Sequence, residues 1–181
     1  MFREEAPGVW VAPAEAVAPV PGWLQDGLRD DAWRPAVVGG GTATKVRMSK
    51  RWAGSITRER FPDGIDAFEA EAMALARPLL QSLSPTFATL RPRGSEFVRY
   101  DRFGFFSTHR DSGGSLRRRC FTIMRYLNEC TGGATIFPEL GYAKQPRTGD
   151  WLMFYAEHVH AGMPVLGGDK ILFVTALDPA D

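Results

Sequence analysis

The chain has 181 residues, and 44% of them are hydrophobic, which is enough for one buried core and too few for two. We therefore expect a single domain over residues 1–181. The 22 basic and 21 acidic side chains nearly cancel and include no long basic run, so the composition argues against a nucleic-acid-binding surface. Cys120 and Cys130 are too few for a disulfide framework, and no apolar stretch is long enough to cross a membrane. A cytoplasmic protein is the expectation.

Only a few elements of the N-terminal half are well defined by the sequence. Residues 8–11 predict a short strand, and residues 22–33 carry apolar side chains at nearly helical spacing. The glycines at 39–41 predict a flexible connection, because they lack the Lys-Ser/Thr and the strand-loop-helix context of a phosphate-binding loop. The basic, polar segment 42–60 fits either a solvated hairpin or a lid over an active site, and both interpretations stay open.

The main helix is expected over residues 63–83, where apolar side chains recur on one face and Pro78 should kink or divide the helix. Beyond it the pattern changes to short β-rich segments. The expected strands cover about residues 95–101, 105–111, 119–127, 134–137, 151–155, 158–161 and 171–177. Helices followed by a run of short strands favour an antiparallel barrel or sandwich with helices packed on one side.

Alternation divides the strand at 119–127 into two faces. One face is polar enough to line a cavity and the other apolar enough to pack against helices, with Arg125 as the exception. The first set is Thr122, Met124, Tyr126 and Asn128, and the second is Phe121, Ile123 and Leu127. In the last strand, Lys170 shares a face with Leu172 and Val174. From that strand alone, the simplest expectation is a lysine that reaches solvent.

The chain has three histidines, and their positions predict a metal site. His109 and Asp111 are two residues apart in an expected strand, so their side chains project from one face, about 6 to 7 Å apart along the backbone. His158 and His160 are related in the same way, and geometry alone does not choose between them. Two imidazoles and a carboxylate that leave coordination positions open suit a non-heme iron(II) that handles oxygen.

Further motifs surround the histidines in a definite order. Before His109 come Phe97-Val98-Arg99-Tyr100, Gly104 and Phe106; after it come Arg119, Thr122, Tyr126-Leu127-Asn128, the run from Gly132 to Pro138, His160-Ala161-Gly162-Met163-Pro164-Val165, Gly168 and Lys170. This set, over about residues 95–178, resembles the iron(II)- and 2-oxoglutarate-dependent dioxygenases, within their prolyl 4-hydroxylase-like branch. The resemblance implies a mainly β fold with flanking helices around a double-stranded β-helix (jelly-roll, cupin-like) core. Residues 1–94 would form N-terminal helices and a lid, and residues 95–178 the core that carries the site.

The resemblance also implies the metal ligands. The family pattern of His, Gly-x-Pro-Val and Gly-x-Lys matches His160, so His109, Asp111 and His160 are expected to bind and serve the catalytic iron. His158 would then lie just outside the ligand set or contact the substrate. The presence of Asp111 argues against the halogenating subset of the family, which lacks this ligand.

The cosubstrate residues follow from the same resemblance. Lys170 and Tyr126 are expected to bind the far carboxylate of 2-oxoglutarate, through a charge-assisted bond and a phenol bond. This role reverses the expectation that Lys170 reaches solvent. Tyr100 is expected beside the metal. Dioxygen would be the second cosubstrate.

The implied activity is hydroxylation of an unactivated C–H bond, with succinate and carbon dioxide as co-products. We favour an amino-acid-like small molecule as the substrate, in a biosynthetic role. A peptidyl (prolyl) hydroxylase is the alternative, although Phe106 stands where many relatives have tyrosine. A nucleic-acid demethylase is disfavoured by the neutral charge and by Lys170 in place of an arginine. A non-redox, cupin-like metal-binding protein would explain the metal ligands but not Tyr126 and Lys170.

The segment from Lys45 to Arg60 offers candidate substrate contacts. We predict that Arg47, Arg51, Trp52 and Arg58 hold a carboxylate-bearing substrate, because arginine forks match carboxylate geometry. His158 completes this predicted set. The sequence does not indicate an oligomeric state.

Overall fold

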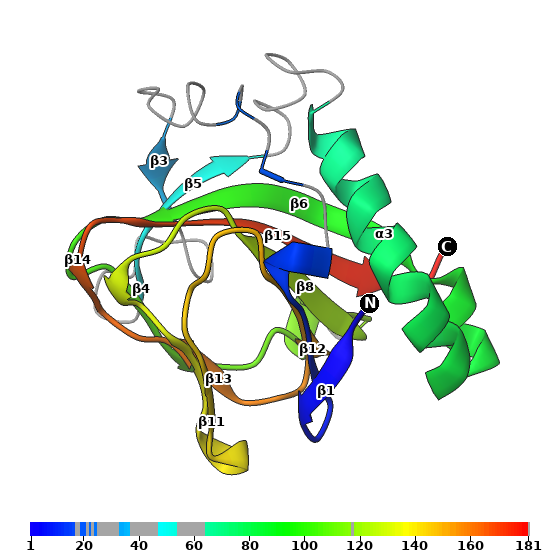
Figure 1. Cartoon of the computed structure of the whole chain (residues 1–181). Coiled ribbons are helices and arrows are strands. Elements are labelled where there is room, and N and C mark those ends of the chain that lie inside the picture. The colour runs from blue at the N-terminus through cyan, green and yellow to red at the C-terminus, as the bar shows by residue number, and fades with distance from the viewer. Residues whose placement is uncertain are drawn as a thin grey trace.

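The computed structural model of the protein describes residues 1–16, 19–20, 22, 24, 33–36, 47–53, 64–116 and 118–180, with the backbone alone at 47, 50–53 and 115. Strands predominate in this part of the chain (Figure 1). The long helix α3 spans Gly64–Leu83. Short 3-10 helices span Ala14–Ala16 (η1), Pro85–Thr89 (η2), Gly114–Leu116 (η3) and Pro138–Leu140 (η4). No helix within the described ranges is both long and apolar enough to span a membrane.

The described strands form two large antiparallel sheets and one small pair. The eight-stranded sheet has the order β1 (Arg3–Ala6), β2 (Val9–Ala12), β12 (Trp151–Tyr155), β8 (Phe121–Tyr126), β15 (Lys170–Asp178), β6 (Arg91–Tyr100), β5 (Lys50–Ala53) and β3 (Arg34–Pro35). The five-stranded sheet has the order β11 (Tyr142–Lys144), β10 (Thr135–Phe137), β13 (His160–Gly162), β7 (Phe105–His109) and β4 (Arg47–Met48). The pair is β14 (Val165–Gly167) with β9 (Thr131–Gly132). The expected double-stranded β-helix core is thereby confirmed.

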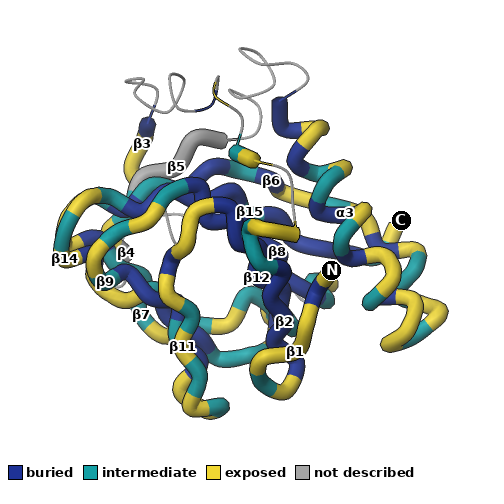
Figure 2. The backbone as a smooth tube through the Cα atoms, in the orientation of Figure 1, coloured by how far each residue is buried: buried dark blue, intermediate teal, exposed yellow. Residues whose placement is uncertain are grey.

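Helix α3 supplies the apolar layer that covers the eight-stranded sheet. Its buried side chains recur every three to four residues and are Ile65, Phe68, Ala72, Met73, Ala76 and Leu80. The ring of Phe68 meets the rings of Phe97 and Phe173 on the sheet, with centroids 5.7 and 5.1 Å apart. Figure 2 shows that the strands of this sheet beneath α3 are buried along most of their length. Each buried aromatic of this kind contributes about 1.5 to 3 kcal/mol, so this layer is the main apolar core.

Pro78 does not divide helix α3, contrary to one of the two outcomes expected from the sequence. The helix runs without a break from Gly64 to Leu83 with Pro78 inside it. Proline removes the hydrogen bond to the carbonyl four residues earlier, which here belongs to Ala74. Both residues are exposed, so water can satisfy that carbonyl, while the buried face of the helix stays packed.

The alternation expected in the central strands is confirmed. In β8, Phe121 and Ile123, with Leu127 just past the strand, belong to the core beneath α3, whereas Met124 and Tyr126 belong to a second core cluster between the two sheets. In β15, Phe173 faces α3 and Leu172 faces the interior. One set of strands therefore supports the helix with one face and builds the site with the other.

Arg125, the exception in that pattern, has a partner in helix α3. Its side chain is fully buried, and its Nη1 atom lies 2.8 Å from Oε2 of Glu71. The guanidinium also lies 5.5 Å from the ring centroid of Phe68 and 5.4 Å from that of Trp151. Charge pairing and contact with two aromatic rings allow an arginine to occupy the outer core.

The N-terminal region contributes strands to the core sheet. The strand expected at 8–11 is observed as β2, which pairs with β12 and carries β1 at the edge of the sheet. The region before residue 95 therefore does more than provide helices and a lid. The helix expected at 22–33 falls mostly outside the described residues, and the connection at 39–41 falls entirely outside them.

Part of the segment 42–60 forms strands of both sheets: β4 is an edge strand of the five-stranded sheet, and β5 lies between β6 and the edge strand β3. β4 pairs with β7 of the five-stranded sheet, and β5 pairs with β6 of the eight-stranded sheet. These few described residues therefore connect the two sheets at the side where β6 and β7 lie. Residues 42–46 and 54–60 lie outside the described residues, so the choice between hairpin and lid stays a prediction.

Candidate metal centre and active-site pocket

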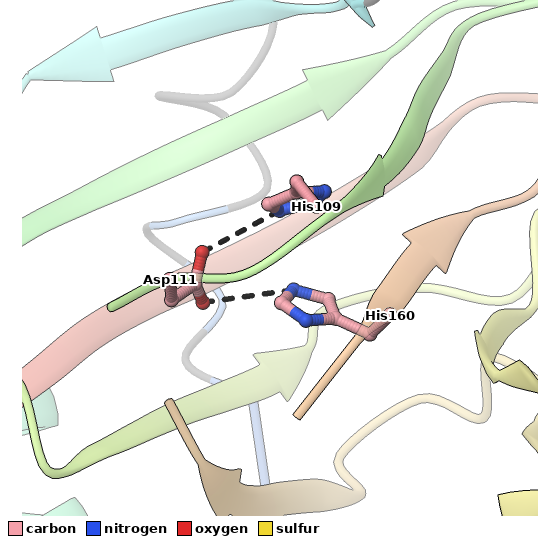
Figure 3. Close-up of side chains that lie close together, drawn as sticks. All are labelled: His109, Asp111 and His160. Carbon is pink, nitrogen blue, oxygen red and sulfur yellow. Dashed lines mark ion pairs between the residues drawn. The ribbon is translucent and has the colours of Figure 1, made fainter. Parts of the chain in front are cut away.

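The structure brings His109, Asp111 and His160 together (Figure 3). His109 ends strand β7 and His160 begins strand β13, its neighbour, and the two residues are directly opposite in the register. The Nε2 atoms of His109 and His160 lie 3.4 and 3.6 Å from the two carboxylate oxygens of Asp111. One donor atom from each residue lies within 4.8 Å of the others, which allows a single metal ion to contact all three.

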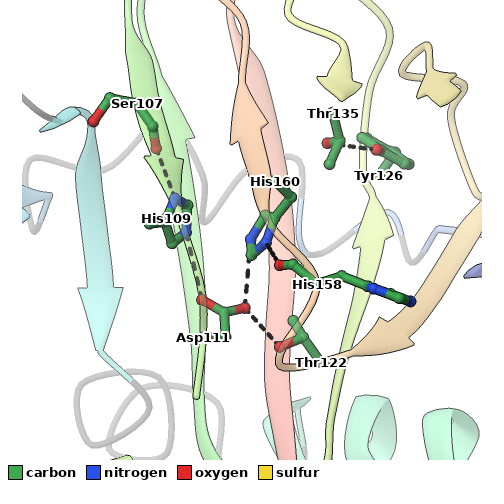
Figure 4. Close-up of polar contacts among 8 residues, drawn as sticks. All are labelled: Ser107, His109, Asp111, Thr122, Tyr126, Thr135, His158 and His160. Atoms are coloured by element: carbon green, nitrogen blue, oxygen red, sulfur yellow. Dashed lines mark hydrogen bonds and ion pairs between the residues drawn. The ribbon is translucent and has the colours of Figure 1, made fainter. Parts of the chain in front are cut away.

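Backbone carbonyls orient both imidazoles. Nδ1 of His109 donates to the carbonyl oxygen of Ser107 at 2.7 Å, and Nδ1 of His160 donates to that of His158 at 3.0 Å (Figure 4). Each bond fixes the tautomer that leaves a lone pair on Nε2. Both lone pairs are therefore available towards Asp111, as metal binding requires.

Asp111 lies beyond the end of its strand, which the sequence had placed through residue 111. β7 ends at His109, and the backbone N–H of Asp111 donates instead to the carbonyl of Ala156 at 2.9 Å. The Thr122 hydroxyl donates to Oδ2 of Asp111 at 2.6 Å. The carboxylate is thus held by contacts outside its own sheet rather than by a regular ladder.

The electrostatics of the cluster favour a charged Asp111. Burial acts to raise the pKa of this carboxyl, but its contact with His109, the nearby His160 and the Thr122 hydroxyl outweigh it and hold the pKa well below its usual value. Burial lowers the pKa of His160, with Asp111 opposing the effect. An anionic carboxylate and a neutral imidazole are the protonation states that bind metal.

A pocket of roughly 130 Å³ opens between the two sheets at the metal centre. Its wall includes the three candidate ligands, Lys170 and Thr135. The rest of the wall is Gly94, Glu96, Val98, Tyr100, Phe106, Arg119, Thr122, Met124, Gly162, Leu172, Val174 and Ala176. The pocket therefore joins a possible cation-binding cluster to a buried lysine within one cavity lined by both polar and apolar side chains.

Lys170 lies inside the protein, contrary to the expectation from its strand alone. Its side chain is 1% exposed, and Nζ donates to the carbonyl of Gly133 at 2.7 Å and lies 4.5 Å from the ring centroid of Tyr100. Burial lowers the pKa of Lys170 to about 8, and the nearby Cys130 thiol only partly opposes this. Within the described part of the chain, no carboxylate pairs with Nζ, so this ammonium group suits an anionic ligand.

A glycine makes room for this lysine contact. Gly133 has a φ of +68°, and a Cβ atom there would lie 2.8 Å from Sγ of Cys130. Another residue would therefore be strained and would clash. The backbone bend at Gly133 directs its carbonyl oxygen towards Nζ of Lys170.

The structure places Tyr126 differently from the sequence-based expectation. Its hydroxyl is buried and donates to Oγ1 of Thr135 at 2.8 Å, and Tyr126 is absent from the pocket wall. Thr135 does line the pocket, and it pairs with Gly162, where a Cβ atom would lie 3.6 Å from Nζ of Lys170. Sequence reasoning missed Thr135, although it is the one hydroxyl-bearing residue in the run from Gly132 to Pro138.

The other predicted residues fall in three places. Tyr100 lies against Lys170 and lines the pocket, and Phe106 stacks on His109 with ring centroids 3.6 Å apart. His158 points its ring away from the metal cluster (Figure 4), towards Tyr155 and Phe137. Its backbone carbonyl, rather than its imidazole, serves the site.

The predicted substrate arginines are described only in part. Arg47 lies in β4, opposite the pocket residue Phe106, and Arg51 and Trp52 lie in β5. Only the backbone is described at these positions, and Arg58 lies outside the described residues. Their contact with a substrate stays a prediction.

Comparison with known proteins agrees with this geometry. Residues 95–176 match the family model of the 2OG-Fe(II) oxygenase superfamily. A putative prolyl 4-hydroxylase of Acanthamoeba polyphaga mimivirus is 33% identical, in a match that covers 41% of this chain and 40% of that protein. The comparison therefore concerns less than half of the viral relative.

Solved structures share the fold over nearly the whole chain. The viral collagen prolyl hydroxylase of Paramecium Bursaria Chlorella virus-1 is 20% identical, with a TM-score of 0.67 over 96% of this chain and 97% of that chain. A Pseudomonas putida prolyl-4-hydroxylase is 18% identical, with a TM-score of 0.67 over 96% and 94%. A Trichoplax adhaerens prolyl hydroxylase, solved with a peptide fragment of the hypoxia inducible factor oxygen degradation domain, is 14% identical, with a TM-score of 0.72 over 94% and 83%.

Fold, donor set and family match define an oxygenase of the iron(II)- and 2-oxoglutarate-dependent class. Residues 95–176 carry the 2OG-Fe(II) oxygenase domain, and the similar proteins named above are prolyl 4-hydroxylases or prolyl hydroxylases. The cofactor and cosubstrates expected from the sequence are those of this superfamily: iron(II), 2-oxoglutarate and dioxygen. Two imidazoles and a carboxylate fit the iron.

Proposed function

We propose that this protein hydroxylates a C–H bond of its substrate, with 2-oxoglutarate and dioxygen as cosubstrates and succinate and carbon dioxide as co-products. The observation that carries the proposal is one pocket whose wall contains both the His109, Asp111 and His160 cluster and the buried cation Lys170. A cupin-like metal protein without redox activity would need the first set but not the second.

The residues divide the work between them. Iron(II) bound at the cluster supplies the activation of dioxygen that couples decarboxylation of 2-oxoglutarate to hydroxylation. Lys170 offers an ammonium group, and Thr135 a hydroxyl, to the far carboxylate of 2-oxoglutarate. Val98, Met124 and Leu172 add apolar side chains to the same wall, against which a C–H bond of the substrate can pack.

We propose a proline residue within a peptide as the substrate. The matched relative is named a putative prolyl 4-hydroxylase, and one similar structure was solved with a peptide bound. These likenesses favour a peptidyl substrate over the amino-acid-like small molecule that we favoured from the sequence. The activity of those proteins supports the proposal by analogy within the superfamily.

An amino-acid-like small molecule is the second candidate, and the charges of the pocket wall favour it. Apart from the candidate metal ligand Asp111 and the buried Lys170, the ionisable carboxylate and guanidinium in the described wall belong to Glu96 and Arg119. A residue pair of opposite charge suits the ammonium and carboxylate groups of a free amino acid.

The test is a comparison of substrates with iron(II) and 2-oxoglutarate supplied. Succinate formation and substrate oxidation are measured together for proline-containing peptides, free proline and other free amino acids. The proposal expects hydroxylated proline in peptides, and its loss in the His160→Ala variant. Turnover of free amino acids alone would replace it with the second candidate, and no succinate with any substrate would contradict both.

We also propose that the protein works in the cytoplasm on a partner that is not a nucleic acid. Cys120 and Cys130 are both free thiols, which persist in reducing compartments. The net charge of +1 offers little attraction to a phosphate backbone. Cell fractionation and nucleic-acid binding measurements test the two parts separately.

A further inference from the structure

Thr122 connects the eight-stranded sheet to the metal centre. It lies in β8, in register with Phe154 of β12 and Ala176 of β15, so a strand pairs with it on each side. Its side chain is 2% exposed and lines the pocket, and its hydroxyl donates to Oδ2 of Asp111 at 2.6 Å (Figure 4). The donor therefore stands on a strand that is paired on both sides.

The acceptor stands on a less constrained part. Asp111 follows the end of β7, and the backbone bond to Ala156 fixes its main chain but not its carboxylate. Rotation of an aspartate carboxylate about its last bond is broad and nearly two-fold, so either oxygen can point at a metal. Both oxygens have histidine neighbours here, Oδ1 near His109 and Oδ2 near His160. The two histidines alone do not choose between the oxygens.

We propose that Thr122 is the positioning residue for the metal ligand Asp111: its hydrogen bond holds Oδ2 and leaves Oδ1 as the oxygen that binds the metal. The inference goes beyond the proposed hydroxylase function and rests only on metal binding at the cluster. Single-oxygen binding by Asp111 keeps coordination positions open, as the chemistry of this class requires. Without the hydroxyl, the carboxylate is free to rotate or to bind through both oxygens.

The contact is of the strong kind. A short O–H···O bond to an anionic carboxylate is roughly twice as strong as a neutral one. Partners that orient a metal ligand typically account for a factor of about 10 to 100 in metal affinity. The Thr122 hydroxyl has a single proton, and the bond to Asp111 uses it.

Two variants separate this role from simple packing. Thr122→Val keeps the shape and removes the hydroxyl, whereas Thr122→Ser keeps the hydroxyl and removes a methyl group. Thr175→Val is the matched control, because buried Thr175 accepts a hydrogen bond from Ser95 at 2.7 Å in the neighbouring strand and is absent from the described pocket wall. Thr122→Ala repeats the test if valine prevents folding.

The measurements are manganese(II) affinity by titration and the absorption spectrum of the protein loaded with cobalt(II), which reports ligand geometry. We expect Thr122→Val to bind manganese(II) about 10- to 100-fold more weakly and to change the cobalt spectrum. Thr122→Ser should restore both properties, and Thr175→Val should alter neither.

Two results would overturn the inference. One is unchanged affinity and spectrum in both Thr122→Val and Thr122→Ala; the other is an equal defect in Thr122→Ser, which would assign the effect to the methyl group. Neither measurement involves 2-oxoglutarate or a substrate. A failure here is therefore distinguishable from a failure of the proposed hydroxylase activity, which is read as succinate and hydroxylated product.

Discussion

The hydroxyl of Tyr126 donates a hydrogen bond to Oγ1 of Thr135, 2.8 Å away, and both side chains are buried. Burial raises the pKa of Tyr126 far above its usual value, with the bond to Thr135 opposing the effect, so the phenol keeps its proton and remains the donor. The proton of the Thr135 hydroxyl is then free to point into the pocket towards a ligand. A bond across the two sheets thus determines which hydroxyl faces Lys170.

The Thr135→Val substitution tests that assignment. It removes the pocket hydroxyl and leaves the phenol of Tyr126 buried without its acceptor, and a lost bond to a charged group typically costs about 1.5 to 3 kcal/mol. We expect the dissociation constant of 2-oxoglutarate to rise more than tenfold, and to rise less in Tyr126→Phe, which leaves Thr135 in place. Calorimetric titration with manganese(II) bound measures both values. A larger defect in Tyr126→Phe would return the direct role to the tyrosine.

Removal of the Lys170 ammonium should weaken the binding of 2-oxoglutarate more than Thr135→Val or Tyr126→Phe does. Lys170→Met keeps most of the buried aliphatic volume of the side chain and deletes the charge. The comparison variant is Tyr126→Phe, measured in the same titration. Equal affinities of wild type and Lys170→Met would remove the main reason to place 2-oxoglutarate in this pocket.

The pH dependence of 2-oxoglutarate binding should report Lys170. Its pKa in the folded protein is about 8 because of burial, against an ordinary value of 10.5. The cosubstrate binds the charged form, so affinity should be level below pH 8 and fall by up to tenfold per pH unit above it. Lys170→Met should lack this slope, and a slope that persists in the variant would point to another group.

The lowered pKa of Lys170 also affects the unfolding free energy, which should rise with pH where the affinity for 2-oxoglutarate falls. Between pH 8 and 10.5 the unfolded chain binds the proton of Lys170 more tightly than the folded chain, so unfolding free energy from this group rises with pH in that window. Below pH 8 both states are charged, and the full cost of burying the ammonium is present. Denaturant melts of the ligand-free wild type and of Lys170→Met, compared at pH 7.5 and 10, measure the difference.

The two neighbouring histidines should behave differently when replaced. His160→Ala removes an Nε2 atom of the cluster and should reduce metal affinity severely, whereas His158→Ala keeps the backbone carbonyl that orients His160. The His158→Ala variant should therefore retain bound metal. It should lose some stability, because the ring of His158 packs on Tyr155 and Phe137. Anaerobic iron titration separates the two variants. Full metal binding by His160→Ala would show that the ligand set is wrong.

Strand positions and the metal cluster followed from sequence because their signals are local or ordered along the chain. Alternation placed the faces of β8 and β15 correctly, and the spacing from His160 to Lys170 identified a lysine that is buried in the structure. Asp111 was predicted to lie in the strand but follows its end. Its backbone N–H bonds to the carbonyl of Ala156 instead, and no local sequence pattern contains that tertiary contact.

Contacts between the two sheets could not be predicted from the sequence in the same way. The bond from Tyr126 to Thr135 depends on how the two sheets face each other, and the sequence offered only two hydroxyl-bearing residues in different strands. The addition of β1 and β2 to the large sheet likewise depends on pairing with β12, more than 130 positions away in the chain. Arg125 was noticed as an exception, but its partner in α3 could not be named from alternation.

The ion pair between Arg125 and Glu71 carries the last prediction. Arg125 is fully buried, while the Glu71 side chain is 24% exposed, so removal of the acid takes the carboxylate of this ion pair away from a buried charge. Glu71→Gln should lower the unfolding free energy by about 2 to 4 kcal/mol, near the lower end of values for broken buried pairs because Glu71 is partly solvated. Arg125→Met removes the charge itself and should cost less, since Phe68 and Trp151 still offer apolar contacts. In the double variant the loss from Glu71→Gln should largely disappear, as urea melts of the four proteins can show. Additive losses in that cycle would mean that the two side chains stabilise the protein independently.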